Sequence, residues 1–150
     1  MGAMRHFDHD FVNDVMARLG RIRPDAKPRW GVLTPAGMIE HLADTIRYSM
    51  GRGGDLPDRS NWFMRAIAAP LVLNGIFPML KNYPEPGYGK MRRGHDDLES
   101  FHALLEEYLS LVETGAMTPK RHFLFGDIGV DGWAKMHVVH FEHHLKQFGV

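Results

Sequence analysis

Four of the ten histidines in this 150-residue chain lie within eight residues near its C-terminal end, as His137, His140, His143 and His144. Residues four apart on a helix stand one above the other, so His140 and His144 can hold one metal ion between them. A third ligand must come from a distant part of the chain, and His41, in another helical pattern, is the best candidate. The spacing therefore predicts a metal site formed by His41, His140 and His144.

The face that carries this pair is otherwise aromatic. At about 100° per residue, His137 shares the face with Trp133 and Phe141, whereas His143 falls on the outer face. Imidazoles on a buried face are costly unless they are hydrogen-bonded or bound to a metal. The alternative is a set of ordinary structural histidines, because a His-x-x-x-His pair without a zincin glutamate is only moderately specific. His137 could hydrogen-bond a ligand residue, bind the metal, transfer a proton or be structural.

Helical periodicity dominates the rest of the chain and predicts an all-α fold, a four-helix bundle with long loops and a kinked third helix. A single domain over residues 1–150 is expected. The first four residues, which include a second methionine, are expected to be a remnant of expression and not part of the fold. Regular helices are expected from Phe7 to Leu19, Pro35 to Met50 and Asp96 to Thr114. An apolar helix is expected from Trp62 to Leu80, which Pro70 and Pro78 kink or break. A short extended piece from His122 to Phe125 should precede a terminal helix that has Asp131 as its N-cap and reaches Gln147.

The composition excludes several classes of protein. Equal numbers of basic and acidic residues, 18 each, give no overall field that would attract nucleic acid or an anionic membrane. The chain has no cysteine, so disulfides, thiolate zinc sites and a cysteine nucleophile are ruled out. The longest uncharged run, Ala66 to Leu80, is too short to cross a bilayer. The first residues lack the apolar core of a signal peptide, so we expect a cytoplasmic location.

The terminal segment His140-Phe-Glu-His143-His144-Leu-Lys-Gln147, together with His41 in an Ile-Glu-His-Leu segment, resembles the DinB-like (YfiT-like) superfamily of metal-dependent bundle proteins. The resemblance extends from about Arg29 to the terminal segment. It implies that His41, His140 and His144 bind a divalent metal, zinc or nickel, and that the protein forms a homodimer. After the second histidine of the pair many members have Arg-Gly-Gln, whereas this chain has Leu-Lys-Gln.

Two further segments are similar to a branch of that superfamily described only as a domain of unknown function. The first is Trp30-Gly31 followed by Thr34-Pro35, and the second is Phe125-Gly126 followed by Trp133.

Three neutral imidazoles leave a coordination position open, as in catalytic metal sites. Asp44 and Tyr48, one and two turns after His41, could reach the same cavity and move a proton. Arg92 and Arg93 form a candidate anion site for a small-molecule substrate.

The resemblance implies a thiol-dependent transferase or isomerase, in which the metal activates a low-molecular-weight thiol. One alternative is a metal-dependent hydrolase that activates bound water. Another is a non-catalytic bundle that binds a ligand or partner through its apolar surface, with structural histidines. We expect no nucleic-acid or membrane partner in any of these cases.

Overall fold

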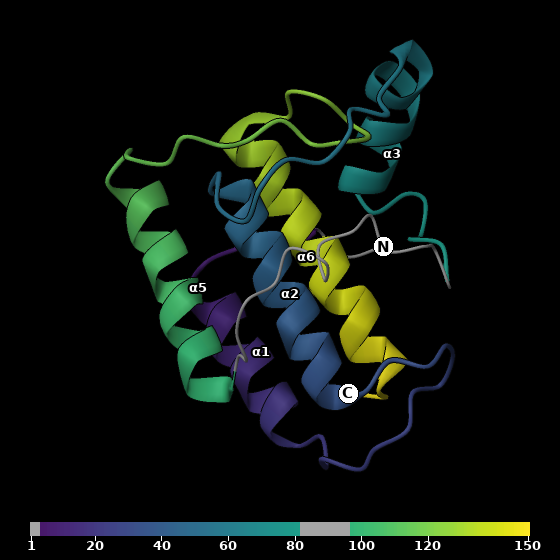
Figure 1. Cartoon of the computed structure of the whole chain (residues 1–150), viewed down its shortest axis with the longest axis vertical. Coiled ribbons are helices and arrows are strands. Elements are labelled where there is room, and N and C mark those ends of the chain that lie inside the picture. The colour runs from purple at the N-terminus through teal and green to yellow at the C-terminus, as the bar shows by residue number, and fades with distance from the viewer. Residues whose placement is uncertain (1–3, 82–96) are drawn as a thin grey trace.

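The protein is described by a computed structural model that covers residues 4–81 and 97–150. This part of the chain is all-helical and contains no strand, which confirms the all-α prediction (Figure 1). Its only β-pairing is an isolated bridge between His122 and Gly126. The helices are α1 (His9–Gly20), α2 (Pro35–Ser49), α3 (Ala69–Leu73), α5 (Leu98–Glu113) and α6 (Gly129–Gln147), with a π-helical turn (Met64–Ala68) directly before α3.

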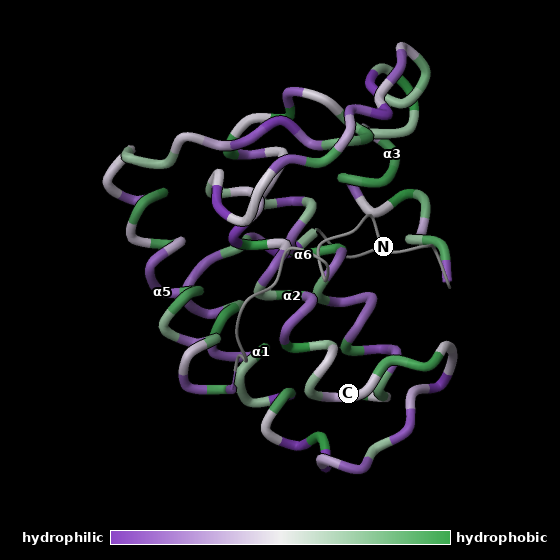
Figure 2. Tube along the Cα trace, viewed as in Figure 1, coloured by the Kyte–Doolittle hydropathy of each residue, from purple (hydrophilic) through white to green (hydrophobic). Residues whose placement is uncertain are grey.

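The four long helices pack around one core. Helix α5 contacts α1 and α2, while α6 contacts α1, α2 and α3. Hydrophobic residues recur along each long helix (Figure 2), and the side chains of Phe11, Leu42, Leu105 and Phe141 are completely buried. Burial of each such side chain contributes about 1.5–3 kcal/mol. The core therefore fixes α2 against α6, the two helices that carry the predicted metal ligands.

Side-chain caps explain where three of the helices begin. Asp8 accepts a hydrogen bond from the Phe11 amide at the start of α1, and Thr34 accepts one from the Gly37 amide at the start of α2. Asp97 forms a reciprocal capping box with Ser100 at the start of α5. The start of α2 at Pro35 matches the predicted boundary, because an N-cap threonine followed by proline is a strong local signal.

The apolar stretch from Trp62 to Leu80 departs from its prediction. The helix ends at Leu73 and is not broken at Pro70. The Ala69 amide bonds back to the Met64 carbonyl, five residues earlier, so the turn before the proline is wider than an α-helical turn. A wider turn leaves room for the pyrrolidine ring, which would collide with the preceding turn of a regular α-helix.

Two predictions in the C-terminal half were also wrong, the N-cap of the last helix and the extended piece before it. Helix α6 begins at Gly129 after Ile128, so Asp131 lies in its first turn and is not the N-cap. A carboxylate in the first turn still favours the helix, because it faces the positive end of the helix dipole. The expected extended piece at His122 is a tight turn, closed by two backbone hydrogen bonds with Gly126, whose φ of 75° suits glycine.

No helix in the described ranges has both the length and the apolar character that a membrane span requires.

Candidate metal centre

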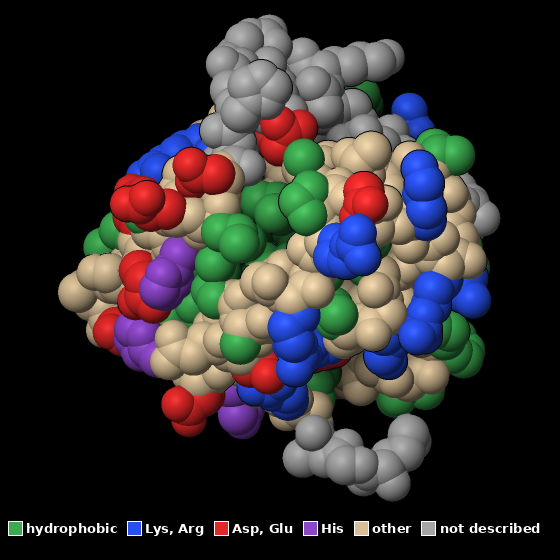
Figure 3. Space-filling view, turned by 90° about the horizontal axis from the view of Figure 1, so that it is seen from below, with side chains coloured by type: hydrophobic (Ala, Val, Ile, Leu, Met, Phe, Trp, Pro, Cys, Tyr) green, Lys and Arg blue, Asp and Glu red, His purple; other side chains and the backbone are tan. Residues whose placement is uncertain are grey.

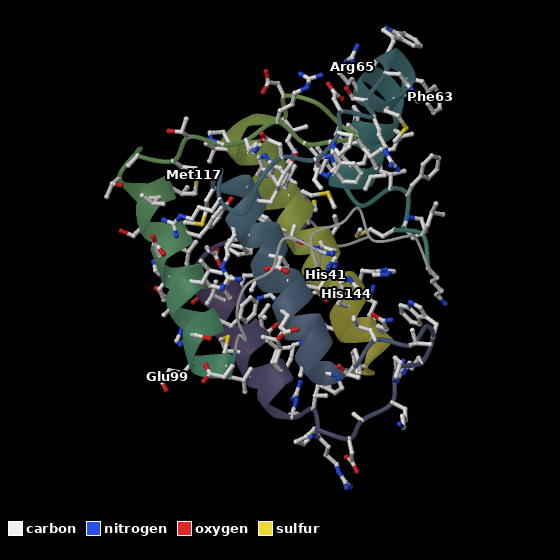
Figure 4. All side chains as sticks on the ribbon, in the orientation of Figure 1. His41, Phe63, Arg65, Glu99, Met117 and His144 are labelled. Carbon is white, nitrogen blue, oxygen red and sulfur yellow. The ribbon has the colours of Figure 1, made fainter. Side chains whose placement is uncertain are left out.

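Three histidine side chains meet between α2 and α6. His41 Nε2 lies 2.8 Å from His140 Nε2, and His144 Nε2 lies 3.1 Å from the same atom. The ligand atoms of all three lie within 4.8 Å of one another. Tetrahedral metal–nitrogen bonds of about 2.0–2.1 Å would separate the nitrogens by roughly 3.3 Å. The three imidazoles could therefore hold one metal ion. Figure 4 labels His41 and His144 close together where α2 and α6 lie side by side.

The hydrogen bonds of His144 determine which of its nitrogens can bind a metal. Gln147 Nε2 donates to the Trp30 carbonyl at 2.9 Å, so the amide oxygen of Gln147 faces the other way. That oxygen lies 2.7 Å from His144 Nδ1 and can only accept, so Nδ1 carries the proton. The Nε2 lone pair of His144 is therefore directed at the histidine cluster, which is the arrangement that outer hydrogen bonds give to metal-binding histidines.

Burial keeps the histidines on α6 neutral. Only 5% of His140 is exposed, and burial, together with the neighbouring His41 and His144, holds its pKa well below the usual value. Burial, followed by the proximity of His41, lowers the pKa of His144 to about 3. A neutral imidazole is the form that binds a metal, so both residues have a lone pair available at neutral pH.

The cluster forms part of the wall of a cavity of about 750 Å³. This volume lies in the range of small-molecule sites. Most of the wall is apolar, with side chains such as Leu33, Met79, Phe123 and Met136. Its acidic groups are Glu40 and Asp44, and no lysine or arginine within residues 4–81 and 97–150 lines it. The cavity therefore suits a largely apolar molecule that reaches the histidines with one end.

His143 was expected on the outer face, and that expectation was wrong. Its side chain is half-buried and lines the cavity, with its ring 5.4 Å from that of Trp30. The loop between α1 and α2 causes this burial, because it folds over the C-terminal end of α6. The Arg29 amide donates to the Gln147 carbonyl at 2.7 Å and holds the loop there.

His137 lies in the core and not on the cavity wall. Ser49 Oγ donates to the Ile46 carbonyl at 2.7 Å, so it accepts the hydrogen bond from His137 Nε2, which is 3.0 Å away. The imidazole stacks on Trp133 and meets Tyr108 edge to face. Burial lowers the pKa of His137 to about 3. Of the alternatives left open for this residue, these contacts favour the structural one.

The structure separates the two predicted proton-transfer residues. Asp44 is buried, lines the cavity and accepts a hydrogen bond from Arg47 at 3.1 Å. The Tyr48 hydroxyl donates to the Arg121 carbonyl at 3.2 Å, and Tyr48 is not among the residues that line the cavity. A catalytic role for Asp44 or Tyr48 stays a prediction. The predicted anion site, Arg92 and Arg93, lies outside the described residues.

A family model described as "Protein of unknown function (DUF1569)" matches residues 3–149, which include every element of the cavity. The chain belongs to the DUF1569 family. The prediction of a domain of unknown function is therefore confirmed. No curated protein and no solved structure matches the chain.

Gln147 and His122, two polar residues of the DUF1569 cavity, were not found by sequence reasoning. Gln147 follows His144 by three residues on the same helix face, so helical spacing could have indicated it. His122 lies in the turn before α6, where no periodicity places a side chain. Only the fold brings His122 to the same cavity as the three-histidine cluster.

Proposed function

We propose that this DUF1569 protein is a metal-dependent enzyme that acts on a small, largely apolar molecule. The observation that carries the proposal is the convergence of three Nε2 atoms on the wall of a cavity of about 750 Å³. His41, His140 and His144 would bind zinc or nickel and leave at least one position for a substrate or water. The proposal includes a four-helix bundle of DinB-like type, formed by α1, α2, α5 and α6.

The first reaction that we propose is transfer involving a low-molecular-weight thiol. A bound divalent ion would lower the pKa of such a thiol, and the chain has no cysteine of its own to serve as nucleophile. The apolar wall would hold the electrophile beside the histidines. An anionic thiol also needs a counter-charge, and Arg92 and Arg93 are our candidates for it.

Metal-dependent hydrolysis is the second candidate. It is favoured by the carboxylates of Glu40 and Asp44, which line the same cavity as the histidines. A carboxylate there could accept a proton from metal-bound water. The thiol reaction needs an added thiol and hydrolysis does not, so the two are readily separated.

We also propose a non-catalytic binding role or a homodimer, either of which would use the apolar surface around α3. Several large apolar side chains around α3 are exposed, including 70% of Trp62, 57% of Phe63 and 56% of Phe77. Phe63 projects outward at the end of the molecule beside Arg65 (Figure 4). Exposed apolar groups of this size are common where protein surfaces associate.

The decisive experiment uses protein purified without a histidine tag. Elemental analysis would show about one zinc or nickel ion per chain. Turnover of 1-chloro-2,4-dinitrobenzene with added thiols would then be compared with hydrolysis of p-nitrophenyl esters without thiol. Activity should disappear in His140→Ala and persist in His102→Ala, a matched change at a partly exposed helical position outside the cavity. Equal rates in both variants would contradict an enzyme built on this site.

A further inference from the structure

His122 is a buried polar side chain on the wall of the cavity. It lies in the turn between α5 and α6, is only 4% exposed, and its ring is stacked against the rings of Phe123 and Phe125 at 4.9 and 4.7 Å. These contacts hold the imidazole in one orientation. His122 lines the same cavity as His41, His140 and His144 without belonging to their cluster.

The backbone of the turn determines where the His122 ring carries its proton. The amides of Leu124 and Phe125 both donate to His122 Nδ1, at 3.0 and 3.1 Å. A nitrogen that accepts two hydrogen bonds cannot itself be protonated, so the proton of the neutral ring is on Nε2. Burial lowers the pKa of His122 to about 3, which keeps the ring neutral under physiological conditions. His122 is therefore a hydrogen-bond donor without a charge.

Among the residues that the structure describes, none accepts a hydrogen bond from Nε2 of His122. Although the His122 side chain is buried, its Nε2 atom is not fully enclosed by protein, so an acceptor inside the cavity can reach it. The donor carries no charge, and the wall around it is mostly apolar, with no lysine or arginine among its described residues. A neutral donor in an apolar wall best matches a neutral oxygen.

We propose that His122 Nε2–H binds the carbonyl oxygen of a small, otherwise apolar ligand, a ketone, ester or amide, inside the cavity. The proposal deepens the proposed function, on which it rests, by naming the substrate class of the same cavity. One end of the ligand would face the three-histidine cluster, while its carbonyl group would be fixed by the turn before α6.

The chain offers a variant that removes the donor alone. In His122→Asn the amide oxygen takes the place of Nδ1 and can still accept the two backbone amides, as in an Asx turn. The Nε2–H group has no counterpart in asparagine. His122→Phe is the harsher companion, because it keeps an aromatic ring but leaves both amides without their acceptor.

The test uses two ligands of nearly the same shape, cyclohexanone and methylenecyclohexane, in which a carbonyl oxygen is exchanged for a CH₂ group. Each is titrated into metal-loaded protein and into chelator-treated protein, and dissociation constants are obtained from ¹H–¹⁵N spectra. Cyclohexanone should bind His122→Asn about tenfold more weakly than wild type, and methylenecyclohexane should change less than about twofold. Imidazole ¹⁵N shifts of the wild type should show the His122 proton on Nε2.

The proposal is overturned if the proton is on Nδ1, if neither ligand binds, or if the two ligands respond equally to His122→Asn. Metal content is measured separately on the same samples. Carbonyl-selective binding by a chain that takes up no metal would support the His122 assignment while contradicting the metal enzyme. Metal-dependent turnover with no response to His122→Asn would support the metal enzyme and contradict the His122 assignment.

Discussion

The molecule has two groups of neighbouring histidines, one between helices and one on the surface. Between α2 and α6, His41, His140 and His144 approach one another with no carboxylate among the cluster's ligand atoms. On the outside of α1 and α5, His9 and His102 have carboxylate partners instead. His9 Nε2 lies 2.6 Å from Glu113, and His102 Nε2 lies 3.4 Å from Glu106. Figure 3 shows histidine and acidic side chains gathered on one side of a face whose other side is rich in lysine and arginine.

The two groups show that the surroundings decide what a histidine can do. The hydrogen bond to Glu113 is the main reason that the pKa of His9 is raised, so this ring favours the protonated form. Burial is the main reason that the pKa of His144 falls to about 3. A protonated ring forms an ion pair, whereas a neutral ring offers a lone pair. Of the two groups, the one between α2 and α6 is therefore suited to bind a metal.

Replacing His140 should give the largest effect, because its Nε2 lies within 3.1 Å of both other cluster nitrogens. In His140→Ala the metal content should fall from about one ion per chain to less than about a tenth of that. Elemental analysis of tag-free protein is the measurement. His102→Ala, in the surface group, should retain the metal. If both variants retained it, the two groups would not differ in their ability to bind a metal.

Replacing Gln147 should weaken metal binding without abolishing it. Gln147→Ala removes the acceptor that keeps the proton of His144 on Nδ1, so zinc affinity should fall about 10- to 100-fold. Competition with a chromogenic zinc chelator measures this change. The neighbouring exposed residue supplies the control, since Lys146→Ala should bind zinc as wild type does. An unchanged affinity in Gln147→Ala would show that this hydrogen bond does not support the site.

Acid should destabilise the metal-free protein through its buried histidines. The folded pKa of His137 is about 3, below its unfolded value of about 6.5, so the folded state binds fewer protons between these values. The contribution of such a histidine to the free energy of unfolding is thus complete above pH 6.5. It is lost as the pH falls toward 3, by up to about 1.4 kcal/mol per pH unit. Urea unfolding at pH 7 and pH 5 should show a smaller loss for His137→Phe than for wild type. Equal losses would mean that His137 does not titrate in this way.

The smallest effect is expected at His9, whose contribution to stability changes with pH in the opposite direction to that of His137. Because its folded pKa is raised, the ion pair with Glu113 stabilises the protein at low pH and is lost as the pH rises through that pKa. Since His9 is exposed, His9→Ala should shift the melting temperature by less than about 2 °C at pH 5.5 and by nothing measurable at pH 8.5. Thermal melts at low and high salt check this, because salt should reduce the difference. A larger shift at pH 8.5 would contradict the assignment.

The parts of the site that lie on regular helices could be predicted from the sequence. The spacing of His140 and His144 is a property of one helix, and His41 lies in an equally clear helical pattern, so the cluster followed from periodicity and a search for a third ligand. The start of α2 at Pro35 was equally accessible, because its cap is local in sequence. Local signals therefore predicted much of the helical framework and the central three residues.

The parts that depend on distant segments could not be predicted in this way. Helical spacing placed His143 outside, because it cannot show that the loop containing Trp30 covers that side of α6. The proline rule predicted a kink or a break at Pro70, because it does not show that a π-helical turn before the proline lets the helix continue through it. His122 was missed because it reaches the cavity from an irregular turn. Each error arose where a tertiary contact or an irregular backbone overrode a regular pattern.

The hydrogen bond from Gln147 to Trp30 ties the candidate metal site to the loop between α1 and α2. Opening of that loop would release the Trp30 carbonyl, free the Gln147 amide to rotate and remove the constraint on His144. The loop also supplies part of the cavity wall. The dwell time of a bound ion and the entry of a ligand would then share one opening step, so a ligand that closes the loop would slow the escape of the metal.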